Sequence, residues 1–107
     1  MNKIYHLSTC STCKRIMNEL DKTVLESCVL QDIKKEHISP ESLDELAQKM
    51  GSYEALFSRK SQQYRAQGLH ERTLSEADYR TLILSHYTFL KRPVMLIGEK
   101  ISVGSQK

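Results

Sequence analysis

The feature that most constrains this chain is a C-x-x-C motif, Cys10 to Cys13, which stands between a short apolar run and an amphipathic stretch. The run at residues 4–7 is typical of a β-strand. Cys13 begins a set of apolar residues with the i, i+3, i+4 and i+7 spacing of one helix face. The sequence therefore predicts a strand, a tight loop and a helix, with Cys10 at the start of the helix. A C-x-x-C in this setting indicates dithiol redox chemistry.

The two cysteines differ in the chemistry that their positions predict. A cysteine at a helix start faces unpaired N–H groups and the positive end of the helix dipole. Both favour the thiolate, and such placements lower a cysteine pKa to between about 3.5 and 7.5. We therefore predict that Cys10 is a reactive thiolate rather than a buried inert cysteine. Cys13 lies in the apolar stripe, so it is either a thiol that resolves a Cys10 mixed disulfide or a small core residue.

Length and composition limit the class of protein. The 107 residues contain no Pro/Gly-rich linker, which favours a single domain over residues 1–107. No apolar stretch approaches the roughly 18 residues of a membrane span, and the N-terminus leads directly into a strand, so we expect neither a membrane partner nor a signal peptide. The cysteines are then expected to be reactive thiols in the cytoplasm. A net charge of +3 is too small to indicate direct nucleic-acid binding.

The next segments predict a second strand and a well-marked helix. Residues 23–33 are rich in Val, Leu and Ile, and a strand, helix and strand within about 30 residues form a βαβ unit with parallel strands. A helix is predicted between Ser39 and Gly51, because Ser39 is a suitable N-cap, Pro40 suits the first helical position and Gly51 can end the helix. A short helical segment is expected over residues 53–57.

The second half of the chain predicts one more helix and a hairpin. Residues 58–73 are basic and lack strong periodicity, so we expect a surface loop or short helices. A helix is predicted from Ser75, where Asp78 completes an Asp version of the capping box. Residues 94–103 predict a β-hairpin that turns at Gly98.

This order of elements predicts an α/β, thioredoxin-like fold. It consists of a β-α-β unit, a helical insertion at about residues 38–90 and a β-hairpin. We expect a mixed four-stranded sheet with helices packed around it.

Four stretches of the chain resemble the arsenate reductase (ArsC) family, which includes the Spx-type redox regulators. The stretches are YHLSTCSTCKR at 5–15, GSYEALFSR at 51–59, LKRPV at 90–94 and VG at 103–104. Their order and spacing are specific together and extend over essentially the whole chain. The resemblance implies a thioredoxin-like fold and a cis peptide between Arg92 and Pro93.

The resemblance also implies roles for individual side chains. Cys10 matches the cysteine that attacks arsenic, and His6 matches a histidine close to that thiolate. Arg59 and Arg92 match arginines that help to bind the oxyanion, a task for which the planar guanidinium is suited. Thr12, inside the same loop, is a further candidate for substrate binding.

The chain departs from the glutathione-dependent reductases at two positions. Cys13 stands where those enzymes have a serine, and Val103 stands where they have a further arginine, which implies a weaker oxyanion pocket. The C-x-x-C is shared instead with the Spx-type branch, in which the pair switches between dithiol and disulfide.

The sequence thus predicts a thiol–disulfide oxidoreductase that resembles an arsenate reductase and has no tightly bound cofactor. Its expected substrate is arsenate or a small disulfide, and its expected reductant is glutathione with glutaredoxin, or thioredoxin. One alternative is a Spx-like regulator that binds the RNA polymerase alpha subunit and uses the C-x-x-C as a redox sensor. Another is a glutathione-binding relative without redox turnover.

A metal site is considered and disfavoured. Cys10, Cys13, Cys28 and His37 could supply four zinc ligands, but structural zinc usually pairs a C-x-x-C with a second tight pair of ligands. Cys28 is expected to be a small hydrophobic residue buried in its strand. His37, His70 and His86 are expected at the surface or at an interface.

Overall fold

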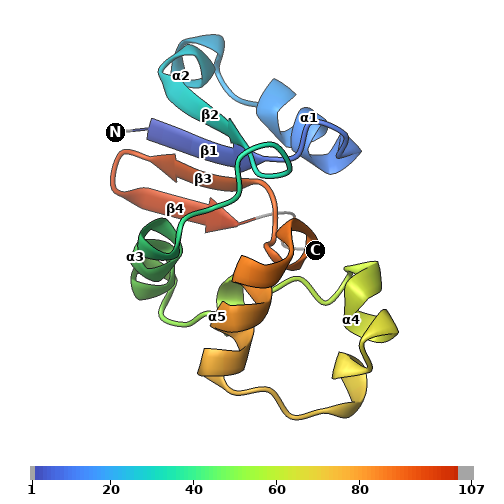
Figure 1. The fold of residues 1–107 in the computed structure, drawn as a ribbon. Coiled ribbons are helices and arrows are strands. Elements are labelled where there is room, and N and C mark those ends of the chain that lie inside the picture. The colour runs from blue at the N-terminus through green and yellow to red at the C-terminus, as the bar shows by residue number, and fades with distance from the viewer. Residues whose placement is uncertain (1, 104–107) are drawn as a thin grey trace. The chain divides into compact units, whose positions relative to one another are not determined.

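The computed structural model describes residues 2–103 (Figure 1). They fall into two compact units, one formed by residues up to Glu36 together with those from Arg92 onward, and the other by His37–Lys91. The first unit contains the sheet, and the second is built from helices. Within the described residues, none of the helices has the length and apolar character that a bilayer span requires.

The first unit is organised by a mixed sheet of four strands in the order β2-β1-β3-β4. The strands are β1 (Asn2–His6), β2 (Cys28–Asp32), β3 (Val94–Ile97) and β4 (Lys100–Val103). The central strand β1 runs parallel to β2 and antiparallel to β3, and β3 and β4 form the hairpin. The predictions of a mixed four-stranded sheet and a thioredoxin-like α/β fold are confirmed.

Helix α1 (Ser11–Asn18) follows β1 as predicted, but the prediction for the next segment is partly wrong. A short helix, α2 (Lys22–Glu26), occupies the first part of the expected strand 23–33, and β2 begins only at Cys28. The Asp21 carboxylate accepts a hydrogen bond of 2.9 Å from the Thr23 N–H. This N-cap starts a helix in spite of the preference of Thr and Val for strands.

The core of the first unit draws on both of its chain segments. Its buried apolar residues are Ile4, Tyr5, Leu7, Cys13, Ile33, Val94 and Val103. Cys13 is the buried residue of α1, with 1% of its surface exposed. The apolar spacing correctly placed Cys13 on the inner face of its helix, and its role as a resolving thiol stays a prediction.

The hairpin and the bond before it also follow the predictions. Gly98 has a φ of 63°, a left-handed conformation that glycine adopts without steric cost in the tight turn between β3 and β4. The Arg92–Pro93 peptide is cis, as the family resemblance implied. Gly104, the second residue of the VG match, lies outside the described residues.

In the second unit, the two long helices begin where the sequence predicted. The Ser39 side chain accepts a hydrogen bond from the third residue of α3 (Pro40–Met50), and Gly51 ends this helix with a φ of 92°. Ser75 and Asp78 form the predicted capping box of α5 (Glu76–Ser85). Shorter helices lie between and after them: η1 (Glu54–Leu56), α4 (Gln62–Ala66), η2 (Leu69–Glu71) and, following α5, η3 (Tyr87–Phe89).

An aromatic cluster forms the centre of the second unit. Phe57 and Phe89 are fully buried and stack with their ring centroids 5.3 Å apart, and the Tyr79 ring lies 4.9 Å from Phe57. The Ser58 N–H donates a hydrogen bond of 2.7 Å to the Phe89 carbonyl. These contacts join the segment after η1 to the segment after α5.

Candidate active site

Cys10 occupies the N-cap position of α1, at the junction between the loop after β1 and the helix. Its N–H donates to the Leu7 carbonyl at 2.9 Å, and its own carbonyl accepts from the Lys14 N–H at 3.2 Å. The bond to Leu7 closes the loop after β1, and the bond from Lys14 is the first hydrogen bond of the helix. The backbone thus fixes Cys10 at the positive end of α1.

The surroundings of Cys10 favour its thiolate. Burial acts to raise the pKa of Cys10, but hydrogen bonds from the N–H and thiol of Cys13 and from the N–H of Thr12, together with the charge of Arg92, outweigh it and lower the pKa. Cys10 makes no regular capping hydrogen bond to α1. The donors at the helix start nevertheless act on its sulfur in the predicted direction.

Cys13 has the opposite character. Burial raises the pKa of Cys13 to about 11, and the hydrogen bond to Cys10 and the negative charge of Cys10 add to this effect. Cys13 is therefore a protonated thiol at neutral pH. Both cysteines are free thiols in this structure.

The first unit brings together four of the predicted site residues: Cys10, Thr12, Cys13 and Arg92. Thr12 lies half-buried in the first turn of α1. Arg92 is half-buried, and its guanidinium lowers the pKa of both cysteines. The loop and the segment before the cis peptide thus bring two thiols, the N–H of Thr12 and a cation to one site.

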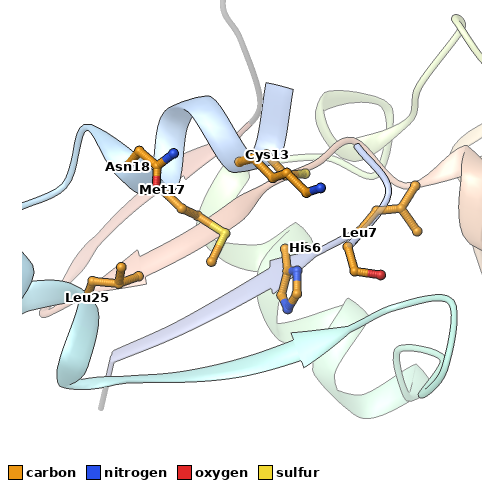
Figure 2. Close-up of a pocket in the computed structure, with 8 residues that line it drawn as sticks. His6, Leu7, Cys13, Met17, Asn18 and Leu25 are labelled. Carbon is orange, nitrogen blue, oxygen red and sulfur yellow. The ribbon is translucent and has the colours of Figure 1, made fainter. Parts of the chain in front are cut away.

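His6 is the last residue of β1 and lies beside Asp32 on β2. A hydrogen bond from the Ser8 hydroxyl lowers the pKa of Asp32 in spite of some desolvation, and the Lys34 N–H and the charge of His6 act in the same direction. His6 also lines a pocket with Cys13 (Figure 2). Sequence reasoning missed Asp32, although the carboxyl ends of two parallel strands meet at one edge of a sheet and could have pointed to it.

Arg59 belongs to the second unit, where local partners hold its side chain. Its guanidinium donates to the Glu54 carboxylate at 2.8 Å and to the Tyr79 hydroxyl at 3.0 Å. It also lies over the Tyr79 ring, 5.7 Å from the centroid. With 47% of the side chain exposed, Arg59 is oriented within its unit and retains an accessible face.

The candidates for the disfavoured zinc site do not cluster. Across residues 2–103, no group of three or more His, Cys, Asp or Glu side chains could hold a metal ion. Cys28 is half-buried rather than buried, because it lies at the first residue of the edge strand β2, where its thiol donates to the Val24 carbonyl at 3.3 Å. The expectation of a buried Cys28 is therefore wrong.

The shifted pKa of Cys10 is open to a direct test. We expect the rate of Cys10 alkylation by iodoacetamide to reach half its maximum at a pH below about 8.5, the value for an unperturbed thiol. Removal of one cationic contributor in Arg92→Gln is expected to move this midpoint upward. Arg15→Gln removes an exposed cation of α1 that is not among the contributors, and it is expected to leave the midpoint unchanged. A wild-type midpoint at or above about 8.5 would contradict the assignment.

Comparisons with known proteins find a matching family model and similar folds. The model of the ArsC family matches residues 5–107. An arsenate reductase of Haemophilus influenzae is 24% identical over 103 residues, which cover 94% of this chain and 88% of the relative. Among solved structures, a possible arsenate reductase from Streptococcus mutans has a TM-score of 0.80 at 29% identity. The match covers 100% of this chain and 92% of the Streptococcus mutans chain. A protein from Brucella melitensis related to arsenate reductase has a TM-score of 0.75 at 27% identity, with 98% and 87% covered.

Proposed function

The chain belongs to the ArsC family, and from this premise we propose that it is an oxidoreductase that reduces arsenate through the thiolate of Cys10. The observation that carries this proposal is the contrast within the C-x-x-C motif. Cys10 has a lowered pKa at the start of α1, while the Cys13 thiol beside it stays protonated. Cys10 is thus suited to nucleophilic attack as a thiolate. Cys13 remains a protonated thiol that can react in a later step.

The proposed reaction begins with attack of the Cys10 thiolate on the arsenic of arsenate. An As–S bond forms and one hydroxyl of arsenate leaves as water after protonation. A second thiol then attacks the Cys10 sulfur, the S–As bond breaks, and its electron pair stays on arsenic. Arsenic is reduced from As(V) to As(III) and leaves as arsenite, while the two thiols are oxidised to a disulfide.

Cys13 is suited to be the second thiol because its pKa depends on the state of Cys10. Two of the causes that raise the pKa of Cys13 are its hydrogen bond to Cys10 and the negative charge of Cys10. Both are lost once the Cys10 sulfur is bonded to arsenic. Cys13 therefore becomes easier to deprotonate at the step that requires its attack, and thioredoxin would reduce the resulting Cys10–Cys13 disulfide.

The remaining candidates are proposed to hold the oxyanion. Arg92 contributes charge close to Cys10, and Thr12 contributes a hydroxyl and an N–H at the start of α1. Arg59, with its accessible guanidinium face, is proposed as the second cation. His6 is proposed to act beside the thiolate through the pocket that it shares with Cys13. Glutathione with glutaredoxin is the alternative reductant, and either system operates in the cytoplasm.

The experiment that tests this function is an NADPH-coupled assay with arsenate. The protein is supplied in turn with glutathione, glutaredoxin and glutathione reductase, or with thioredoxin and thioredoxin reductase. Arsenate-dependent oxidation of NADPH by either system would support the proposal, and phosphate at the same concentration serves as the unreactive control. Absence of turnover with both systems would overturn it. No specific observation favours the alternative of a regulator that binds RNA polymerase, so we do not propose it.

A further inference from the structure

We propose that the pocket beside α1 is a binding site for a small amphipathic anion, a molecule with an apolar body and one carboxylate or similar group. The pocket has a volume of about 370 Å³ and lies wholly within the first unit (Figure 2). This volume is within the range of pockets that hold small ligands. The pocket shares His6 and Cys13 with the proposed arsenate chemistry, but the nucleophile Cys10 does not line it.

The apolar part of the pocket comes from three successive segments of the chain. Leu7 of the loop after β1, Met17 of α1 and Leu25 of α2 line it together with the buried thiol of Cys13. Met17 and Leu25 are only partly buried, so the pocket leaves part of their apolar surface uncovered. Covering such surface with an aliphatic or aromatic group is favourable in water.

The polar part of the pocket selects the charge of the ligand. Lys14 and Asn18 of α1 line it, one with an ammonium group and the other with an amide. No carboxylate is among the lining residues, and Asp32, which lies beside His6, already accepts hydrogen bonds from Ser8 and from the Lys34 N–H. Among the lining residues, a carboxylate on the ligand would meet the Lys14 ammonium and the Asn18 amide and no other carboxylate.

A matched pair of probes tests the proposal: 4-phenylbutyrate and 4-phenylbutylamine, which share an apolar body and carry opposite charges. Each is titrated into the reduced protein and followed by amide chemical shifts. We expect 4-phenylbutyrate to bind with a dissociation constant on the order of 1 mM, ordinary for a molecule of this size, and several times more tightly than the amine. The largest shift changes are expected in the segments that line the pocket, residues 6–8, 13–18 and 25.

Three variants separate this site from general adsorption. Lys14→Gln is expected to weaken binding of the carboxylate about threefold to tenfold and not to weaken binding of the amine, because it removes an attraction for the first and a repulsion for the second. Arg15→Gln removes the neighbouring exposed charge, which does not line the pocket, and is expected to preserve the preference for the anion. Met17→Trp fills the pocket and is expected to abolish binding of both probes, while the amide spectrum reports that the variant is folded.

Equal affinity for the two probes, shift changes centred outside these segments, or equal losses in the Lys14 and Arg15 variants would overturn the proposal. Binding is expected to persist in Cys10→Ser, because Cys10 does not line the pocket. The measurement requires no turnover, so its outcome is independent of the proposed reductase activity.

Discussion

Replacing Cys10 with serine is expected to lower arsenate-dependent NADPH oxidation by at least about 10³-fold with either reductant, because loss of a catalytic nucleophile usually costs that much or more. A serine hydroxyl at this position would remain protonated despite the donors from Thr12 and Cys13 and the charge of Arg92. The assay is the coupled arsenate assay at neutral pH. Cys28→Ser is the matched control, since Cys28 lies at the start of the edge strand and is expected to retain full activity.

The response of the Cys13→Ser variant distinguishes the two reductants. If Cys13 supplies the second thiol, activity with thioredoxin is lost and the Cys10 adduct accumulates. If glutathione attacks the adduct instead, activity with glutaredoxin survives. Arsenate turnover that continues in Cys10→Ser would contradict the proposed mechanism, whatever the result for Cys13.

Replacing Phe57 with alanine is expected to lower the free energy of unfolding by about 3–5 kcal/mol, the usual cost of removing a large buried aromatic side chain. Phe57 is fully buried and contacts the rings of Phe89 and Tyr79. Because small proteins are stable by only about 5–15 kcal/mol, this is a large fraction of the total. Urea denaturation monitored by circular dichroism measures the change.

Two control variants show whether the loss of stability in Phe57→Ala comes from the buried aromatic ring. Phe57→Leu keeps much of the apolar volume and is expected to cost about 1–2 kcal/mol. Leu30→Ala removes an apolar side chain that is 48% exposed on β2, and it is expected to change the stability by less than about 0.5 kcal/mol. A cost for Phe57→Ala as small as that for Leu30→Ala would show that the aromatic cluster does not stabilise the second unit.

The parts of the fold that the sequence predicts best are those in which several local signals agree. The C-x-x-C region combines an apolar run with helical spacing, and the structure has β1 and α1 there. Ser39 and Ser75 each precede a stretch with helical spacing and are suitable caps, and a helix begins directly after each of them. The cis peptide at Arg92 and Pro93 came from the family resemblance, since nothing in local physics predicts it.

The predictions failed where one side chain decided between two backbone states. Residues 22–26 contain Thr23 and Val24, which favour a strand, but the Asp21 cap starts α2 instead. The same error is why the sequence analysis did not predict the pocket. Leu25, one of its lining residues, belongs to α2. Pairing of His6 with Asp32 likewise depends on strand register, which a single sequence leaves undetermined.

The order of strands in the sheet has a consequence for the synthesis of the protein. Strand β1 can pair with β2 once about thirty residues have left the ribosome, whereas its other neighbour, β3, follows about ninety positions after β1. Closing a flexible loop of that length costs about 4 kcal/mol of chain entropy. Arg92, whose charge favours the thiolate of Cys10, directly precedes β3 along the chain. A nascent chain that ends before residue 92 therefore carries Cys10 without the charge of Arg92, and we expect the pKa of Cys10 to fall further once β3 has joined the sheet.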